Sequence, residues 1–263
     1  MLSRLLVLLL LSAPLAADVS FARLKELWGQ QRWREAERLI RQTIAEHSEP
    51  TDLEGIANSS EAKEMLRQAD WPEVQAAYFA RLDQAMAARP GNIPYEIHCR
   101  GIKEQWARFY VIANGSDFGP VTALDEENTA RLQEVVATQG WPRKSEWGER
   151  PALAAWLILQ HSPDTEFQAE MLPLLEKRLQ EKELDGPYFA LLYDRVQMRH
   201  DRAQRYGSQV RKKPDGGWEP VPPLEDPEHL DALRAGVGLQ PIADYLTSIA
   251  KVYDKPATRG WFH

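Results

Sequence analysis

The chain has 263 residues, of which 43% are hydrophobic and 27% are charged. This composition is too apolar for a disordered chain, and the length suffices for one large or two small domains with real cores. The formal charge of −7 at pH 7 argues against a nucleic-acid partner, because surfaces that bind nucleic acids are basic.

The first residues are typical of an export signal. Arg4 precedes an unbroken apolar run over residues 5–11, and the small residues Ala16 and Ala17 follow it. The run is shorter than the roughly 20 residues that a membrane-spanning helix needs. Residues 1–17 are therefore predicted to be a signal peptide that is removed on export, which places the mature protein in the periplasm. The alternative is a signal that is kept as an anchor.

Cys99 is the only cysteine, so the chain can form no internal disulfide. A periplasmic location fits this composition better than a disulfide-rich secreted setting. Neighbouring positions of a helix point about 100° apart, so His98 and Cys99 do not face each other as a catalytic pair. We expect Cys99 to be a small buried thiol.

The N-terminal region reads as helical. Apolar residues recur at helical spacing on both sides of Gly29, which predicts two amphipathic helices joined by a tight turn within residues 21–47. The hairpin resembles one tetratricopeptide unit, but no second copy follows at the expected period of about 34 residues. An ordinary helical hairpin remains the alternative. After a polar loop, further helices are expected over residues 61–68, 71–88, 95–114 and 124–139, with a loop over residues 115–120.

The C-terminal half continues this pattern. Proline in the first turn and glycine after the last turn predict helices over residues 152–161, 166–184 and 187–200. Residues 209–212 and 218–221 flank a Pro-Asp-Gly-Gly turn and predict a β-hairpin. Two short helices follow, over residues 227–235 and 241–252, and then a tail.

Several motifs of this half occur together, in a fixed order. They are Asp125-Glu-Glu-Asn-Thr-Ala-Arg-Leu132, Gly140-Trp-Pro142, Ala154-Ala-Trp-Leu157, Gln160-His161, Asp194-Arg-Val196 and Gln204-Arg-Tyr-Gly207. The chain is thereby similar, over residues 125–246, to a bacterial family of unknown function, number 6624. Members usually carry histidine where this chain has Gln139, so His161 is the one histidine that the resemblance supports. The resemblance implies no activity.

The candidate site is built around His161, Asp194 and Arg205. His161 ends an apolar helix, and as a candidate catalytic residue it is a general acid or base, oriented by Asp194. Arg205 can hold a carboxylate or phosphate in a forked geometry. The candidate ligand-binding residues are Gln160, Arg195, Arg205, Tyr206 and Gln209.

A structural interpretation of the same residues stays open. Asp194 and Arg195 lie among apolar residues, so a buried network is expected in which Arg205 is an available partner for Asp194. Ser162 and Ser208 are weak candidates for a nucleophile. The six histidines show no paired metal-binding spacing, so neither a metal nor a cofactor is expected.

The sequence thus predicts a mainly α protein, a helical bundle or array with one small β-hairpin near the C-terminus. Its expected organisation is a signal peptide (1–17), an N-terminal helical region (18–115), a family domain (116–250) and a tail (251–263). The leading function is an exported binding or interaction module with a polar pocket for a small anionic ligand or peptide, and another envelope protein is a possible partner. The alternatives are a hydrolase or transferase that uses His161, and a purely structural helical adaptor.

Overall fold

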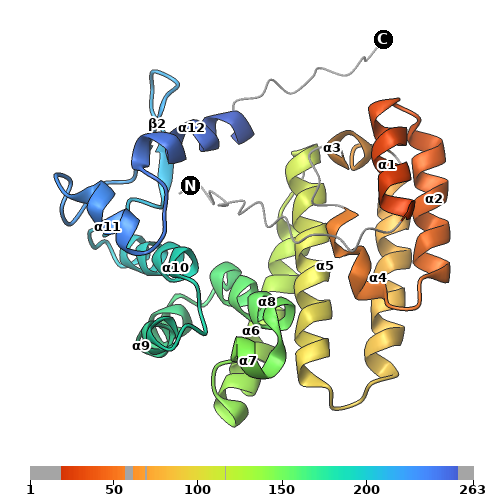
Figure 1. Cartoon of the computed structure of the whole chain (residues 1–263), viewed down its shortest axis with the longest axis horizontal. Coiled ribbons are helices and arrows are strands. Elements are labelled where there is room, and N and C mark those ends of the chain that lie inside the picture. The colour runs from red at the N-terminus through yellow and green to blue at the C-terminus, as the bar shows by residue number, and fades with distance from the viewer. Residues whose placement is uncertain (1–18, 57–61, 69, 116, 254–263) are drawn as a thin grey trace. The chain divides into compact units, whose positions relative to one another are not determined.

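The computed structural model describes residues 19–56, 62–68, 70–115 and 117–253. Within these residues the chain is mainly α-helical, and two short strands pair as one antiparallel hairpin near the C-terminal end (Figure 1). The expected fold class is confirmed. The predicted signal peptide lies outside the described residues.

The chain divides by packing into two compact units. Their described parts are residues 19–164, here called the first unit, and residues 165–253, the second unit. This division follows packing alone, so the domain boundary expected after residue 115 stays a prediction.

The first unit contains helices of very different length. Its elements are α1 (Val19–Gly29), α2 (Trp33–Glu46), the 3-10 helix η1 (Pro50–Ile56), α3 (Ala62–Met65), α4 (Trp71–Ala87), α5 (Ile93–Asn114), α6 (Gly119–Gln139), α7 (Lys144–Trp147) and α8 (Glu149–His161). The two amphipathic helices predicted from the apolar spacing are α1 and α2, which pack on each other. Asn92 caps α5 by accepting a hydrogen bond from the Tyr95 amide, and Gly115 ends it in a left-handed conformation.

One boundary in this unit differs from the expectation. The loop predicted over residues 115–120 is wrong in its last part, because α6 already begins at Gly119. Pro120 lies in the first turn of α6, where proline removes no intrahelical hydrogen bond. The short helix α7 was not expected.

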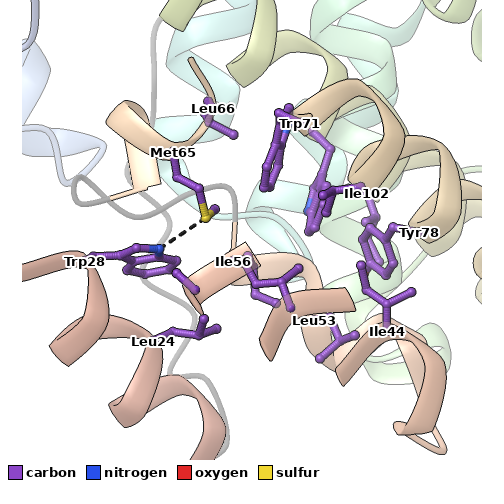
Figure 2. Packing of buried hydrophobic residues seen from close by; sticks show 14 of the residues in the cluster. Leu24, Trp28, Ile44, Leu53, Ile56, Met65, Leu66, Trp71, Tyr78 and Ile102 are labelled. Carbon is purple, nitrogen blue, oxygen red and sulfur yellow. Dashed lines mark hydrogen bonds between the residues drawn. The ribbon is translucent and has the colours of Figure 1, made fainter. Parts of the chain in front are cut away.

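Aromatic side chains pack together in the core of the first unit. Trp106 stacks on Trp71 with ring centroids 5.3 Å apart, and the centroid of the Tyr78 ring lies 4.2 Å from that of Trp106. The indole N–H of Trp28 donates to the sulfur of Met65 at 3.2 Å (Figure 2). Further buried members of the cluster are Leu24, Ile44, Leu53, Ile56, Leu66 and Ile102. These tryptophans therefore contribute to packing of the core.

A close helix crossing joins α5 to α8. Gly101 faces Ala154, and a Cβ atom added at Gly101 would lie 2.7 Å from the Ala154 Cβ and 3.2 Å from its Cα. Such a distance is shorter than van der Waals contact, so the two backbones approach this closely only because position 101 has no side chain.

Replacing Gly101 with alanine should lower the free energy of unfolding by about 1 to 3 kcal/mol, the usual cost of overpacking a core. The loss is expected even though alanine is favoured over glycine in a helix by about 1 kcal/mol. Urea unfolding measures it. Gly29→Ala is the matched control, because nothing lies within 4 Å of a Cβ at that position. A Gly101→Ala protein as stable as the unmodified protein would contradict the close crossing.

The second unit holds the remaining helices and the hairpin. Its elements are α9 (Thr165–Gln180), α10 (Gly186–Arg199), β1 (Val210–Lys212), β2 (Trp218–Pro220), α11 (Leu230–Gly236) and α12 (Ile242–Tyr253). The strand register pairs Val210 with Pro220 and Lys212 with Trp218. Helix α9 ends before the expected position, because Lys182 takes a left-handed conformation with φ of 62°.

None of the helices within the described ranges combines the length and the apolar character needed to span a bilayer.

Candidate functional site

His161 and Gln160 end helix α8 in the first unit. The His161 side chain is 5% exposed, and its Nδ1 atom lies 3.0 Å from Oε1 of Glu104 on α5. Gln160 is buried as well. Glu104 follows Gly101 by one helical turn, and His161 follows Ala154 by two, so the close crossing brings the carboxylate and the imidazole together.

Glu104 belongs to a buried chain of charges that joins three helices. Arg108, one turn further along α5, donates through Nε to Glu104. Its Nη2 atom donates to Oδ1 of Asp125 on α6 at 2.6 Å. The Gln105 amide donates to the second oxygen of Glu104 at 2.6 Å. We call Glu104, Arg108, Asp125 and His161 the Glu104 network.

Neighbouring positive charges keep the buried Glu104 side chain ionised. Burial alone raises the pKa of Glu104, but the charges of His161 and Arg108 outweigh burial and hold this pKa at about 2. The two carboxylates face one guanidinium, so a protonated His161 makes the network neutral.

Glu104 and Arg108 are not among the residues predicted from the sequence. The available signal was their spacing of four residues beside Trp106 on an apolar helix, where an unpaired charge is costly. A carboxylate that holds an imidazole nitrogen is also an arrangement that orients a general base. The side chain exposure of 5% for His161 favours a structural tie between α5 and α8.

Asp194 is fully buried in α10 of the second unit. Its carboxylate accepts three backbone hydrogen bonds, from the amides of Arg205 at 2.8 Å, Tyr206 at 3.0 Å and Ser208 at 2.8 Å. Burial raises the pKa of Asp194, and the backbone donors only partly oppose this effect. Asp194 thus holds the loop of residues 204–209, which we call the 204–209 loop.

The expected pairing of the Arg205 side chain with Asp194 is wrong. Arg205 offers Asp194 its backbone amide, while its guanidinium donates to Glu225. The sequence could not show whether Arg205 contacts Asp194 through its side chain or through its backbone amide, because both contacts place position 205 beside position 194.

The 204–209 loop is also held from its other side. Arg234 is fully buried and donates to the carbonyl oxygen of Tyr206 at 2.6 Å. The Tyr245 hydroxyl donates to the carbonyl oxygen of Ser208 at 2.8 Å. Gly207 takes a φ of 59°, which a residue with a side chain rarely adopts. The loop is therefore a packed element in which most backbone polar groups have internal partners.

Three of the candidate ligand-binding residues lie inside this packing. Tyr206 and Gln209 are 6% and 4% exposed, and Arg195 is buried in α10. The Gln209 side chain donates to the carbonyl oxygen of Leu191 at 3.3 Å. Gln204 completes the loop, since its side-chain oxygen accepts from the Gln209 amide at 2.8 Å. Burial of these groups favours a structural role for them.

Arg205 is the candidate whose side chain reaches the surface. Its guanidinium lies over the Tyr193 ring, 4.6 Å from the centroid, and donates through Nε to Oε2 of Glu225 at 2.8 Å. The Tyr193 hydroxyl donates to the other Glu225 oxygen at 3.1 Å. Side-chain exposure is 38% for Arg205 and 33% for Glu225. We call Tyr193, Arg205 and Glu225 the Arg205 cluster.

The candidate nucleophiles are buried. Cys99 is fully buried, as expected, and burial raises the pKa of its thiol to about 12. Ser162 and Ser208 are 0% and 1% exposed. No group of three or more histidine, cysteine or acidic side chains suited to a metal ion occurs in the described part of the chain.

His161 and Gln160 belong to the first unit, and the other five candidates belong to the second. Neither a curated protein nor a solved structure matches the chain. One family matches residues 99–256, more than half of the chain, and its description is that of a family of unknown function numbered 6624. The match includes the Glu104 network, the 204–209 loop and the Arg205 cluster, and the chain belongs to this family.

Proposed function

We propose that this protein is an exported helical binding module that recognises a small anionic ligand or a peptide carboxylate through Arg205. The placement of the guanidinium carries this proposal. It is oriented by an aromatic face and by one carboxylate, yet more than a third of the side chain stays exposed. An arginine that is already oriented loses less conformational entropy when it binds an anion.

The donors that Arg205 keeps available support the same function. Nε donates to Glu225 and the guanidinium also hydrogen-bonds with the Tyr206 side chain, while no second acidic side chain pairs with it among the described residues. Arginine binds carboxylate and phosphate through two parallel N–H groups. Glu225 also shows how this surface accepts a carboxylate, because Tyr193 and Arg205 each donate to one of its oxygens.

Binding experiments with Arg205→Ala test this function. We expect calorimetry to detect binding of inorganic phosphate or of short peptides with a free C-terminal carboxylate, and Arg205→Ala to raise Kd at least tenfold. That factor corresponds to about 1.4 kcal/mol. Arg211→Ala is the matched control, because Arg211 pairs with Glu219 on the hairpin and is 51% exposed.

Glu225→Gln provides a second test of anion binding by Arg205. It keeps the size of the side chain and removes the charge that competes for Arg205, so it should tighten anion binding. Equal affinities for Arg205→Ala, Glu225→Gln and the unmodified protein would refute the role of Arg205.

A hydrolase or transferase that uses His161 is the second candidate. The 3.0 Å separation of His161 Nδ1 and Glu104 Oε1 favours it, because a carboxylate this close stabilises the charged form of an imidazole. The burial of both side chains counts against it.

Export to the periplasm is part of the proposal, and it rests on the sequence of residues 1–17. We expect protein isolated from the native cell envelope to begin near Asp18, which mass spectrometry of the intact chain measures. Protein that retains Met1, or that is found in the cytosol, would contradict export. The tetratricopeptide-like hairpin α1–α2 is proposed as the contact for another envelope protein.

A further inference from the structure

A cavity of about 310 Å³ lies at the turn between α4 and α5 in the first unit. Its lining includes Met86, Arg89, Pro90, Asn92, Glu96 and Arg100. The volume lies at the small end of the range for ligand pockets, so an occupant would have only a few non-hydrogen atoms. None of the sites described above includes these residues.

Glu96, the acidic residue of the lining, already accepts hydrogen bonds from two arginines. Oε1 of Glu96 accepts from Arg100 Nε and from Arg131 Nε, both at 2.9 Å, and Oε2 accepts from Arg131 Nη2 at 2.9 Å. The hydrogen bonds from Arg131 are the main reason why the pKa of Glu96 is lowered. Glu96 therefore has little capacity left to hold a cationic ligand.

The two arginines of the lining keep unused donors. Arg89 lies over the Tyr95 ring at 4.3 Å and donates through Nη1 and Nη2 to Ala85 and Glu49, which leaves Nε. Arg100 donates through Nε and Nη1, which leaves Nη2 without a partner among the described residues.

Asn92 adds a third donor. Its side-chain oxygen accepts from the Tyr95 amide at 3.2 Å, and its Nδ2 group has no partner within the described ranges. The backbone amides of the first turn of α5 do not contribute, because those of Ile93, Tyr95 and Glu96 donate within the turn and Pro94 has none. Among the side chains that line the cavity, the unused polar groups are thus donors, two of them on cations.

We propose that this cavity binds a small carboxylate with a short alkyl chain. The carboxylate oxygens accept from Arg100 Nη2, Arg89 Nε and Asn92 Nδ2, and the alkyl chain lies against Met86 and Pro90. Charge-assisted hydrogen bonds supply the specificity for an anion, and burial of the alkyl chain adds affinity. This site is independent of the proposed role of Arg205.

Titration of the full chain with acetate, butyrate and n-butylamine tests the site. Ligand-observed NMR should show saturable binding of butyrate, several-fold tighter than that of acetate, and none of n-butylamine. Arg100→Gln should weaken butyrate binding at least tenfold. Arg41→Gln is the matched control, because Arg41 pairs with Glu37 and Glu73 in the same unit and its side chain is 36% exposed.

Asn92→Asp is a second variant, which tests the same site if Arg100→Gln fails to fold. Aspartate caps a helix as well as asparagine does, so α5 should be preserved, while the added negative charge should repel butyrate. Absence of saturable butyrate binding overturns the proposal, as does unchanged binding by Asn92→Asp. Binding that is lost in Arg205→Ala and kept in Arg100→Gln also overturns it, and would assign the carboxylate to the Arg205 cluster.

Discussion

Asp194→Ala should lower the free energy of unfolding of the second unit by about 3 to 5 kcal/mol. The substitution leaves three backbone amides of the 204–209 loop without an acceptor, and each unsatisfied buried donor costs about 1 to 3 kcal/mol. It also leaves the buried Arg234 without the nearby negative charge that Asp194 supplies. Urea unfolding followed by circular dichroism measures the loss.

A conservative variant at position 194 and a control variant at an exposed aspartate complete this experiment. Asp194→Asn keeps the shape but presents an NH₂ group to at least one backbone amide, so it should recover only part of the stability. Asp244→Ala, which changes an exposed aspartate of α12, should stay within about 0.5 kcal/mol of the unmodified protein. Full stability in Asp194→Ala would mean that the loop does not depend on this carboxylate.

Glu104→Ala should destabilise the first unit by a similar amount, about 3 to 5 kcal/mol, the usual cost of breaking a buried ion pair from one side. The substitution leaves Arg108 with Asp125 as its acidic partner and leaves His161 Nδ1 without a carboxylate. Thermal or urea unfolding at neutral pH measures this loss. Glu134→Gln, at a position where the side chain is 67% exposed, is the control and should change little.

The pH dependence of stability offers a separate measurement on Glu104. Its pKa is about 2 in the folded protein against an ordinary value of 4.5, so the folded state binds the proton less readily than the unfolded state. The contribution of Glu104 is therefore complete above about pH 4.5, and it is lost as the pH falls toward 2. The shift corresponds to about 3 kcal/mol. If the loss of stability between pH 4.5 and 2 were the same in Glu104→Gln, this assignment would be refuted.

Local order follows from the sequence where neighbouring residues carry the signal. The apolar spacing and Gly115 predict α5 to within two residues at its start, and the Pro-Asp-Gly-Gly turn predicts the hairpin. These features depend on contacts between residues a few positions apart, for which propensity and periodicity suffice. The same reasoning failed at Gly119, where proline in a first turn looked like a loop.

Residue chemistry also predicted that Asp194 is buried, but not what it contacts. The pattern of Asp194 amid apolar residues correctly predicted a buried carboxylate that needs partners. Its partners proved to be backbone amides, while the guanidinium of Arg205 turned to Glu225. Sequence does not distinguish a side-chain donor from a backbone donor at the same position.

The amino-acid sequence by itself thus determined the mainly α fold class, most helix boundaries, the hairpin and the family. Only the tertiary structure decided that His161 lies against Glu104, that Asp194 holds a loop, and that a pocket open to solvent lies at the α4–α5 turn. The physical reason is that these features join residues distant in the chain. Their positions depend on helix crossings such as Gly101 against Ala154, which local preferences do not encode.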